Sequence, residues 1–286
     1  MRTPDERFAN LPGFDFAPHY VEWRGHRVHY LDEGSGNRTF LCLHGEPTWS
    51  YLYRRMIPRF VASEARVVAP DFIGFGRSDK PEDERLYTFD FHRQFLLDFI
   101  ARLELRHITL VVQDWGGVLG LTLPMEAPID GLFIMNTALA TGDVPLTEGF
   151  IAWRAYVAAN PDLACGKLLA RACPHLSAAE AAAYDAPFPD VRYKAGVRRF
   201  PPMVPEKYDD PGAAISRKAR DWLKNSWRGQ TFMAVGVKDP VLGAPVMNML
   251  RSWIRDCPAP VVIADGGHFL QEWGDEVMNA WSRTTT

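Results

Sequence analysis

The sequence predicts an α/β fold, with a mostly parallel sheet of eight strands, helices on both faces of the sheet and an inserted helical cap. Short β-like runs alternate with longer helical patterns along most of the 286 residues. Continuous apolar runs such as Ile108–Val112 are typical of strands that are buried on both faces. Between residues 139 and 218 this alternation stops, which predicts the insertion.

We expect strands near residues 19–24, 26–32, 39–43, 66–70, 108–113, 131–135, 231–237 and 260–264. The stretch 85–104 has apolar residues at helical spacing and predicts the helix before the fifth strand. In the insertion, Ala-rich helical runs at 151–159, 163–172 and 177–184 are separated by prolines. We therefore divide the chain into a core domain, residues 1–138 and 219–286, and a helical cap, residues 139–218.

Composition excludes several functional classes. The chain is 47% hydrophobic and has a formal net charge of −3, so it can bury a large core and has no basic footprint for nucleic acid or anionic lipid. No apolar segment approaches the ~18 residues of a membrane helix, and residues 1–13 lack the apolar part of a secretory signal. The 4 cysteines have no metal-binding spacing. We expect a cytoplasmic protein with free thiols and with no metal or other cofactor.

The most informative residue is Asp114, which lies in the run VQDWGG (112–117) between the fifth strand and a helix-like stretch. A sharp strand-to-helix turn at this place is a typical position for a nucleophile. A carboxylate is an anion at neutral pH, so it can displace a leaving group from saturated carbon without a base to activate it. Asp is also a common helix N-cap, so the run alone leaves both interpretations open.

Two further motifs follow the last two long strands, in the chain order nucleophile, acid, histidine. Asp239 comes directly after the strand 231–237, where a carboxylate can hold a histidine in the correct tautomer. The alternative is a turn-forming Asp. His268 follows the final strand in the run DGGHF and is the candidate base. Some Asp-nucleophile enzymes take the acid from the end of the sixth strand, but Asn136 stands there and carries no charge.

A fourth motif, HGEP at residues 44–47, follows the strand 39–43. Hydrolysis of an ester on Asp114 places negative charge on the ester carbonyl oxygen, and this charge needs donors aimed at it. The backbone N–H groups of Glu46 and Trp115 are the candidates for this oxyanion hole. The alternative for the HGEP run is an ordinary turn at the end of a strand.

With these motifs, the chain resembles the haloalkane dehalogenases of the α/β-hydrolase superfamily nearly from end to end. In the core, the resemblance is carried by residues 44–49, 113–117, 238–239 and 267–269, and in the cap by residues 183–189 and 199–201. Glu46 and the acid after the seventh strand are similar to one branch of that family.

The resemblance implies hydrolytic removal of halide from small haloalkanes. Asp114 would displace the halide and form an alkyl ester, and His268 would then activate a water that hydrolyses the ester. Besides water, the partners are therefore a haloalkane and a halide; no nucleic acid or membrane partner and no particular oligomeric state is predicted. By resemblance, the Glu46 side chain helps to position the water.

Halide stabilisation requires donors in a dry site, and an indole N–H on an apolar ring is suited to this task. Trp115 is one candidate. In some relatives the second Trp lies deeper in the cap, at a place that aligns with Ala172, so Trp153 is the compensating candidate here. The alternative for Trp153 is a cap-core aromatic residue, and we expect Trp222 to pack the returning helix.

The main rival is an epoxide hydrolase, which shares the fold, the Asp nucleophile and the His base. Such an enzyme needs two cap tyrosines that donate to the epoxide oxygen. Glu46 and Gln113 argue against it, because those enzymes usually carry an apolar or aromatic residue and a histidine at these two places. The cap offers four tyrosines as candidates: Tyr156, Tyr184, Tyr193 and Tyr208.

Overall fold

The computed structural model describes residues 1–284, and over this range the chain forms one sheet of eight strands. The strand order is β1-β2-β4-β3-β5-β6-β7-β8; β2 pairs with β1 and β4 in antiparallel fashion, and the other neighbours are parallel. This confirms the predicted mostly parallel sheet. The strands are β1 (His19–Trp23), β2 (His26–Glu33), β3 (Thr39–Leu43), β4 (Arg66–Pro70), β5 (Ile108–Val112), β6 (Ile129–Met135), β7 (Gln230–Gly236) and β8 (Val261–Ile263).

The predicted strand limits are correct for β3 and β4, and the others differ from the structure by one or two residues at one or both ends. The start of β6 shows why. Ile129 pairs with Ile108 through an irregularity in the register, and the exposed Asp130 interrupts the apolar pattern that predicts the strand. At the sheet edge, β8 is short and pairs with β7 alone.

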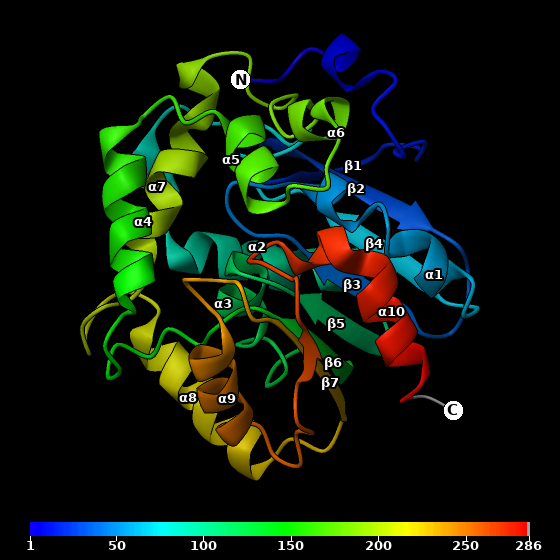
Figure 1. Cartoon of the computed structure of the whole chain (residues 1–286), viewed down its shortest axis with the longest axis vertical. Coiled ribbons are helices and arrows are strands. Elements are labelled where there is room, and N and C mark those ends of the chain that lie inside the picture. Colours follow the sequence, from blue (N-terminus) through cyan, green and yellow to red (C-terminus); the bar gives the residue numbers. More distant parts are fainter. Residues whose placement is uncertain (285–286) are drawn as a thin grey trace.

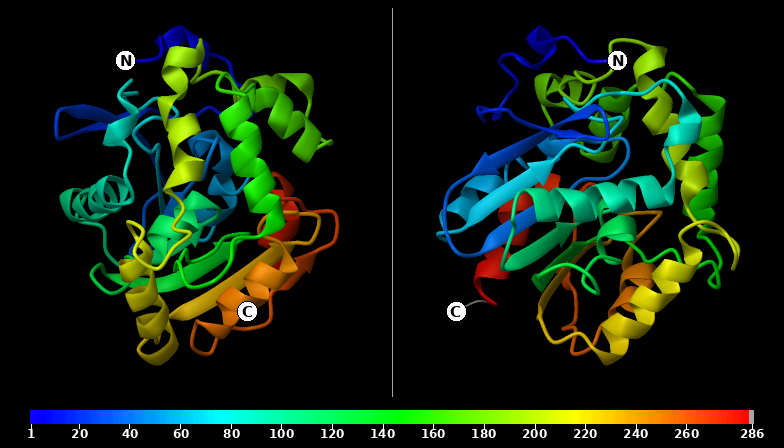
Figure 2. Two further views of the ribbon diagram at one scale, coloured as in Figure 1. Left: turned by 90° about the vertical axis from the view of Figure 1, so that its left-hand side faces the viewer. Right: turned by 180° about the vertical axis from the view of Figure 1, so that it is seen from behind.

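Helices cover both faces of the sheet (Figures 1 and 2). The helices α1 and α10 lie side by side on one face, where rings of Phe60 and Trp281 pack against Phe40 and Phe133 of the sheet. Opposite them lie α2, α3, α8 and α9. The core helices are α1 (Ile57–Val61), α2 (Phe89–Arg102), α3 (Trp115–Gly120), α8 (Ala213–Asn225), α9 (Ala244–Ser252) and α10 (Gly274–Ser282), with 3-10 turns η1 (Asp5–Phe8), η2 (Ser50–Tyr53), η3 (Glu84–Leu86) and η5 (Leu270–Trp273).

The helix expected at 85–104 is shorter in the structure. Thr88 caps α2, since its side chain accepts a hydrogen bond from the Phe91 backbone N–H, and the helix therefore begins at Phe89 and ends at Arg102. The residues before it form the separate 3-10 turn η3.

The insertion after β6 forms the helices α4 (Glu148–Ala159), α5 (Cys165–Ala172), α6 (Ala178–Ala182) and α7 (Ala195–Met203), with the 3-10 turn η4 (Val191–Lys194). The first three lie within the Ala-rich runs or extend them by a few residues. The pattern did not predict α7, because Pro201 and Pro202 look like loop residues; both fall near the end of the helix, which stops at Met203. The expected domain boundary after residue 218 falls inside α8, so we propose that the cap ends in the loop before Ala213.

Two joints of different character attach the cap to the core. At one, the buried Glu272 of η5 accepts two hydrogen bonds from Arg54, at 2.6 and 2.9 Å, one from Arg55 at 3.1 Å and one from the hydroxyl of Tyr184 beyond α6. Glu180 of α6 also bonds Arg54, at 3.1 Å. At the other joint, Phe200 of α7 packs its ring 4.9 Å from that of Trp115 in the core.

None of the helices in residues 1–284 combines the length and the apolar character that crossing a membrane would require.

Candidate active site

The turn between β5 and α3 holds Asp114 in a strained conformation, with φ 51° and ψ −128°. Such backbone angles in a residue other than glycine cost of order 1–3 kcal/mol and occur mainly at functional sites. The Asp114 side chain makes no capping hydrogen bond to α3, which excludes the helix N-cap as its role. The turn needs Gly116, because a Cβ there would lie 2.1 Å from the carbonyl oxygen of Leu43.

The carboxylate of Asp114 lies against the loop after β3. The backbone N–H of Glu46 donates to its Oδ1 at 2.8 Å. This close approach requires Gly45, since a Cβ at that position would lie 2.2 Å from the same oxygen. One predicted oxyanion donor, Glu46, therefore contacts Asp114 directly, and the other, Trp115, is the next residue and the first of α3.

The histidine and the second acid lie on the opposite side of Asp114. The Nε2 atom of His268 is 3.5 Å from Asp114 Oδ2, and its Nδ1 is 2.9 Å from Asp239 Oδ2. Burial lowers the pKa of His268, but the charges and hydrogen bonds of Asp239 and Asp114 outweigh it and raise that pKa to about 10. For Asp239, burial favours the protonated form, yet His268 holds its pKa below the usual value.

Two supporting residues were not predicted from the sequence. Asn136, at the end of β6, donates through Nδ2 to Asp239 Oδ2 at 2.9 Å and accepts from the Gly236 backbone N–H at 2.8 Å. Gln113 donates to the backbone carbonyl of His268 at 3.0 Å. The neighbouring parallel strands β6 and β7 end at the same edge of the sheet. The sequence could therefore have indicated that Asn136, at the end of β6, lies near Asp239, which comes after β7.

The cap supplies the remaining polar group. Nε1 of Trp153, on α4, donates to Glu46 Oε2 at 3.2 Å, which ties the cap to the loop beside Asp114. Burial, followed by the nearby charge of Asp114, raises the pKa of Glu46 well above its ordinary range. Trp115 is 2% exposed, with its ring against α7. Ala172 lies on the cavity wall, and its small side chain offers no donor.

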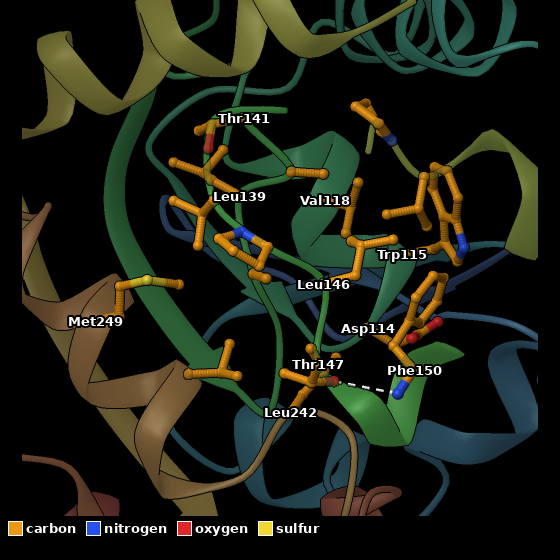
Figure 3. A pocket seen from close by; sticks show the side chains of 17 residues that line it. Asp114, Trp115, Val118, Leu139, Thr141, Leu146, Thr147, Phe150, Leu242 and Met249 are labelled. Atoms are coloured by element: carbon orange, nitrogen blue, oxygen red, sulfur yellow. Dashed lines mark hydrogen bonds between the residues drawn. The ribbon is translucent and has the colours of Figure 1, made fainter. Parts of the chain in front are cut away.

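Two cavities meet at Asp114. The larger has a volume of about 570 Å³ and lies under α4 and α5; Glu46, Trp153 and His268 are among the residues that line it. The smaller has about 80 Å³, and its lining is mostly apolar and includes Trp115 (Figure 3). Phe150 and Asp114 line both cavities and therefore mark the junction. Five of the six predicted site residues thus line a cavity, and Asp239 stands behind His268.

Comparisons with known proteins show the fold and the family of the chain. The family model described as α/β hydrolase fold matches residues 38–275. A haloalkane dehalogenase of Psychrobacter cryohalolentis is 43% identical, over 95% of this chain and 93% of its own length. One from Mycobacterium marinum is 41% identical, over 95% of this chain and 94% of the relative.

Among solved structures, the tetrameric structure of haloalkane dehalogenase DpaA from Paraglaciecola agarilytica NO2 superimposes with a TM-score of 0.95 at 47% identity. That match covers 98% of this chain and 96% of the other.

The chain belongs to the haloalkane dehalogenases. It is an α/β-hydrolase-fold enzyme that acts on carbon–halide bonds.

The rival epoxide hydrolase is not supported. Of the four candidate tyrosines, Tyr156 lines the larger cavity, whereas the buried Tyr184 hydroxyl is bonded to Glu272 and Tyr208 is 58% exposed. Two convergent tyrosine donors, which that chemistry requires, are therefore absent from the two cavities at Asp114 as residues 1–284 form them.

Proposed function

We propose that this haloalkane dehalogenase works through a covalent alkyl ester on Asp114. The observation that carries the proposal is the carboxylate itself, held by the Glu46 N–H at 2.8 Å and facing His268 at 3.5 Å, at the junction of two cavities. An oxygen of Asp114 attacks the halogen-bearing carbon in line; the new C–O bond forms as the C–halogen bond breaks, and halide leaves with the electron pair.

The departing halide needs donors in a site that excludes water. We assign this role to the indole N–H groups of Trp115 and Trp153. Trp115 is fixed between the core and Phe200 of the cap. The N–H of Trp153 already points toward the centre of the site, since it donates to Glu46 there at 3.2 Å. To reach a halide, it exchanges this acceptor for the ion.

In the second half of the reaction, His268 takes a proton from water, and the resulting hydroxide attacks the ester carbonyl of Asp114. The raised pKa of His268 supports this order of events. In the free enzyme, the Asp114 charge helps to hold His268 in the protonated form. Once Asp114 is an ester, that charge is gone, the pKa of His268 falls, and His268 releases its proton to solvent, so that the neutral imidazole can act as a base.

Asp239 stabilises the imidazolium that results, and Asn136 holds the Asp239 carboxylate in place. The backbone N–H of Glu46 is positioned to stabilise the oxyanion of the tetrahedral intermediate, together with that of Trp115. The Glu46 side chain, buried beside Asp114, is the candidate to orient the water. As the intermediate collapses, the His268 imidazolium returns its proton to the departing oxygen, the alcohol leaves, and the carboxyl group of Asp114 loses its remaining proton to solvent and becomes a carboxylate again.

The test is to trap the ester. The purified wild-type protein should release bromide from bromohexane without added metal or nucleotide. His268→Phe should release at most one bromide per protein molecule and gain the mass of one hexyl group. The Trp222→Phe variant, changed in α8 away from both cavities, is the matched control and should turn over normally. An unmodified His268→Phe protein that has consumed substrate would contradict the covalent mechanism.

A further inference from the structure

One wall of the larger cavity leads outward from the reaction centre to a single cation. The ring of Trp153 stacks on that of Tyr156, one helical turn further along α4, with 6.0 Å between the centroids. The guanidinium carbon of Arg171, near the end of α5, lies 5.9 Å from the centre of the Tyr156 ring. All three side chains line this cavity; Trp153 is partly buried and Tyr156 is 41% exposed, so the wall runs from the indole to the rim.

The charge of Arg171 is not neutralised by the protein. Within residues 1–284, its guanidinium makes no ion pair and no side-chain hydrogen bond. The neighbouring charges do have partners: Lys238, which also lines the cavity, is paired with Asp265 at 2.5 Å, and Arg154 of α4 is paired with Glu206 at 2.9 Å. The rim of the cavity therefore presents one unmatched positive charge.

The cavity is also larger than a short haloalkane requires. Its volume of about 570 Å³ lies within the range of about 300–1,000 Å³ that is typical of sites for drug-sized ligands. The negative charge of Asp114 at its inner end disfavours an anionic group there, whereas Arg171 favours one at the outer end. A substrate with a halogen at one end and an anion at the other would thus enter in the productive direction.

We propose that Arg171 is a specificity-determining residue that binds a carboxylate at the far end of the substrate, so that ω-haloalkanoates of medium chain length are a substrate class of this enzyme. The inference rests on the proposed function, because it places the carbon–halogen bond at Asp114. A guanidinium suits this role, since its planar fork can donate two parallel hydrogen bonds to a carboxylate. The aromatic wall of Trp153 and Tyr156 would contact the methylene chain between the two ends.

The experiment compares ω-bromohexanoate with its methyl ester, which has a closely similar shape but no charge. At low ionic strength, Arg171→Gln should lower kcat/KM for the acid about fivefold, mainly through KM, and leave the ester within about twofold. Arg171→Glu should lower kcat/KM for the acid further, and it should not lower kcat/KM for the ester. Arg154→Gln is the matched control, because Arg154 also belongs to the cap helices α4 and α5 but its guanidinium is bonded to Glu206. This variant should leave kcat/KM unchanged for both the acid and the ester.

Added salt should weaken the preference for the acid in the wild-type enzyme and have little effect in Arg171→Gln. Equal loss for acid and ester in Arg171→Gln, or a wild-type enzyme that hydrolyses the ester but not the acid, would overturn the role of Arg171. Failure with bromohexane as well would instead overturn the proposed function, so the two failures are distinguishable.

Discussion

The core and the cap contribute to the site in different ways. Asp114 and His268 follow the carboxyl ends of strands, and hydrogen bonds to their backbone carbonyls fix them. The Thr137 hydroxyl and two backbone N–H groups of α3 donate to the carbonyl of Asp114, and the Gln113 side chain donates to that of His268. Trp153 comes from α4, a helix in which only Val157 is buried. It reaches the core group Glu46 through a hydrogen bond of 3.2 Å.

The cap therefore has more room to vary than the core. Many backbone hydrogen bonds and tight glycine contacts hold the nucleophile and base, so their geometry follows directly from the sheet. The wall of the cavity that α4 of the cap provides has little buried surface, so it is held less firmly and can adapt to the substrate. We therefore expect chemistry to depend on the core half and halide release and substrate choice to depend on the cap half. The predictions below test that division.

The largest effect should come from the core half. Asp114→Asn keeps the shape of the side chain but replaces an anionic nucleophile with a neutral amide, so bromide release should fall at least about ten-thousandfold. Bromide assays and thermal unfolding of both proteins would check this. The variant should fold normally, because the Asp114 side chain makes no cap hydrogen bond. Residual activity above about one per cent of wild type would show that another group attacks the substrate.

The next effect should fall on stability, at the joint between cap and core. Glu272→Ala leaves the buried Arg54 without its bidentate partner and the Tyr184 hydroxyl without an acceptor. We expect a loss of about 3–5 kcal/mol in the free energy of unfolding, as for other broken buried pairs. Denaturant unfolding measures it. Asp275→Ala is the control, since that side chain is 77% exposed and forms a 3.7 Å pair; a similar loss there would contradict the importance of the buried network.

The cap half should show a smaller effect. Trp153→Phe keeps the ring packing on Tyr156 but removes one of the two proposed halide donors, so halide affinity should fall about tenfold and halide release should slow about tenfold. Halide quenching of tryptophan fluorescence and pre-steady-state bromide release would measure the two quantities. If Trp222→Phe produced this result and Trp153→Phe did not, the second halide donor would be misassigned, and the cap would have no part in stabilising the halide.

The sequence predicted the core half of the site better than its supports. Asp114, Asp239 and His268 were accessible because parallel strands end at one edge, so residues that follow different strands meet there. Asn136 was considered only as a missing acid; its hydrogen bond to Asp239 depends on the register between β6 and β7, which a single strand pattern does not contain. The Arg54–Glu272 pair joins residues 218 positions apart, and no local pattern specifies such a contact.

The cap was predicted less completely for a related reason. Its helices follow weak patterns: α4 buries little, and α7 contains two prolines, which in a sequence indicate a loop. Helix α7 forms because tertiary packing outweighs propensity, with the buried Phe200 between Phe75 and Trp115. Such packing depends on the position of the cap against the core, and the sequence of α7 alone does not specify that position.

The last effect concerns the charge of His268, which links the core half to pH. Its pKa is about 10 in the folded enzyme against an ordinary value of 6.5, so folding favours the protonated form. The stabilisation from its contacts with Asp239 and Asp114 is therefore fully present below about pH 6.5, and it is lost as the pH rises toward 10. Thermal unfolding of wild type and His268→Gln across this range would measure it. The wild-type advantage in Tm should be largest near pH 6 and shrink toward pH 10; a difference that is constant with pH would mean that His268 stabilises the core by packing, without its charge.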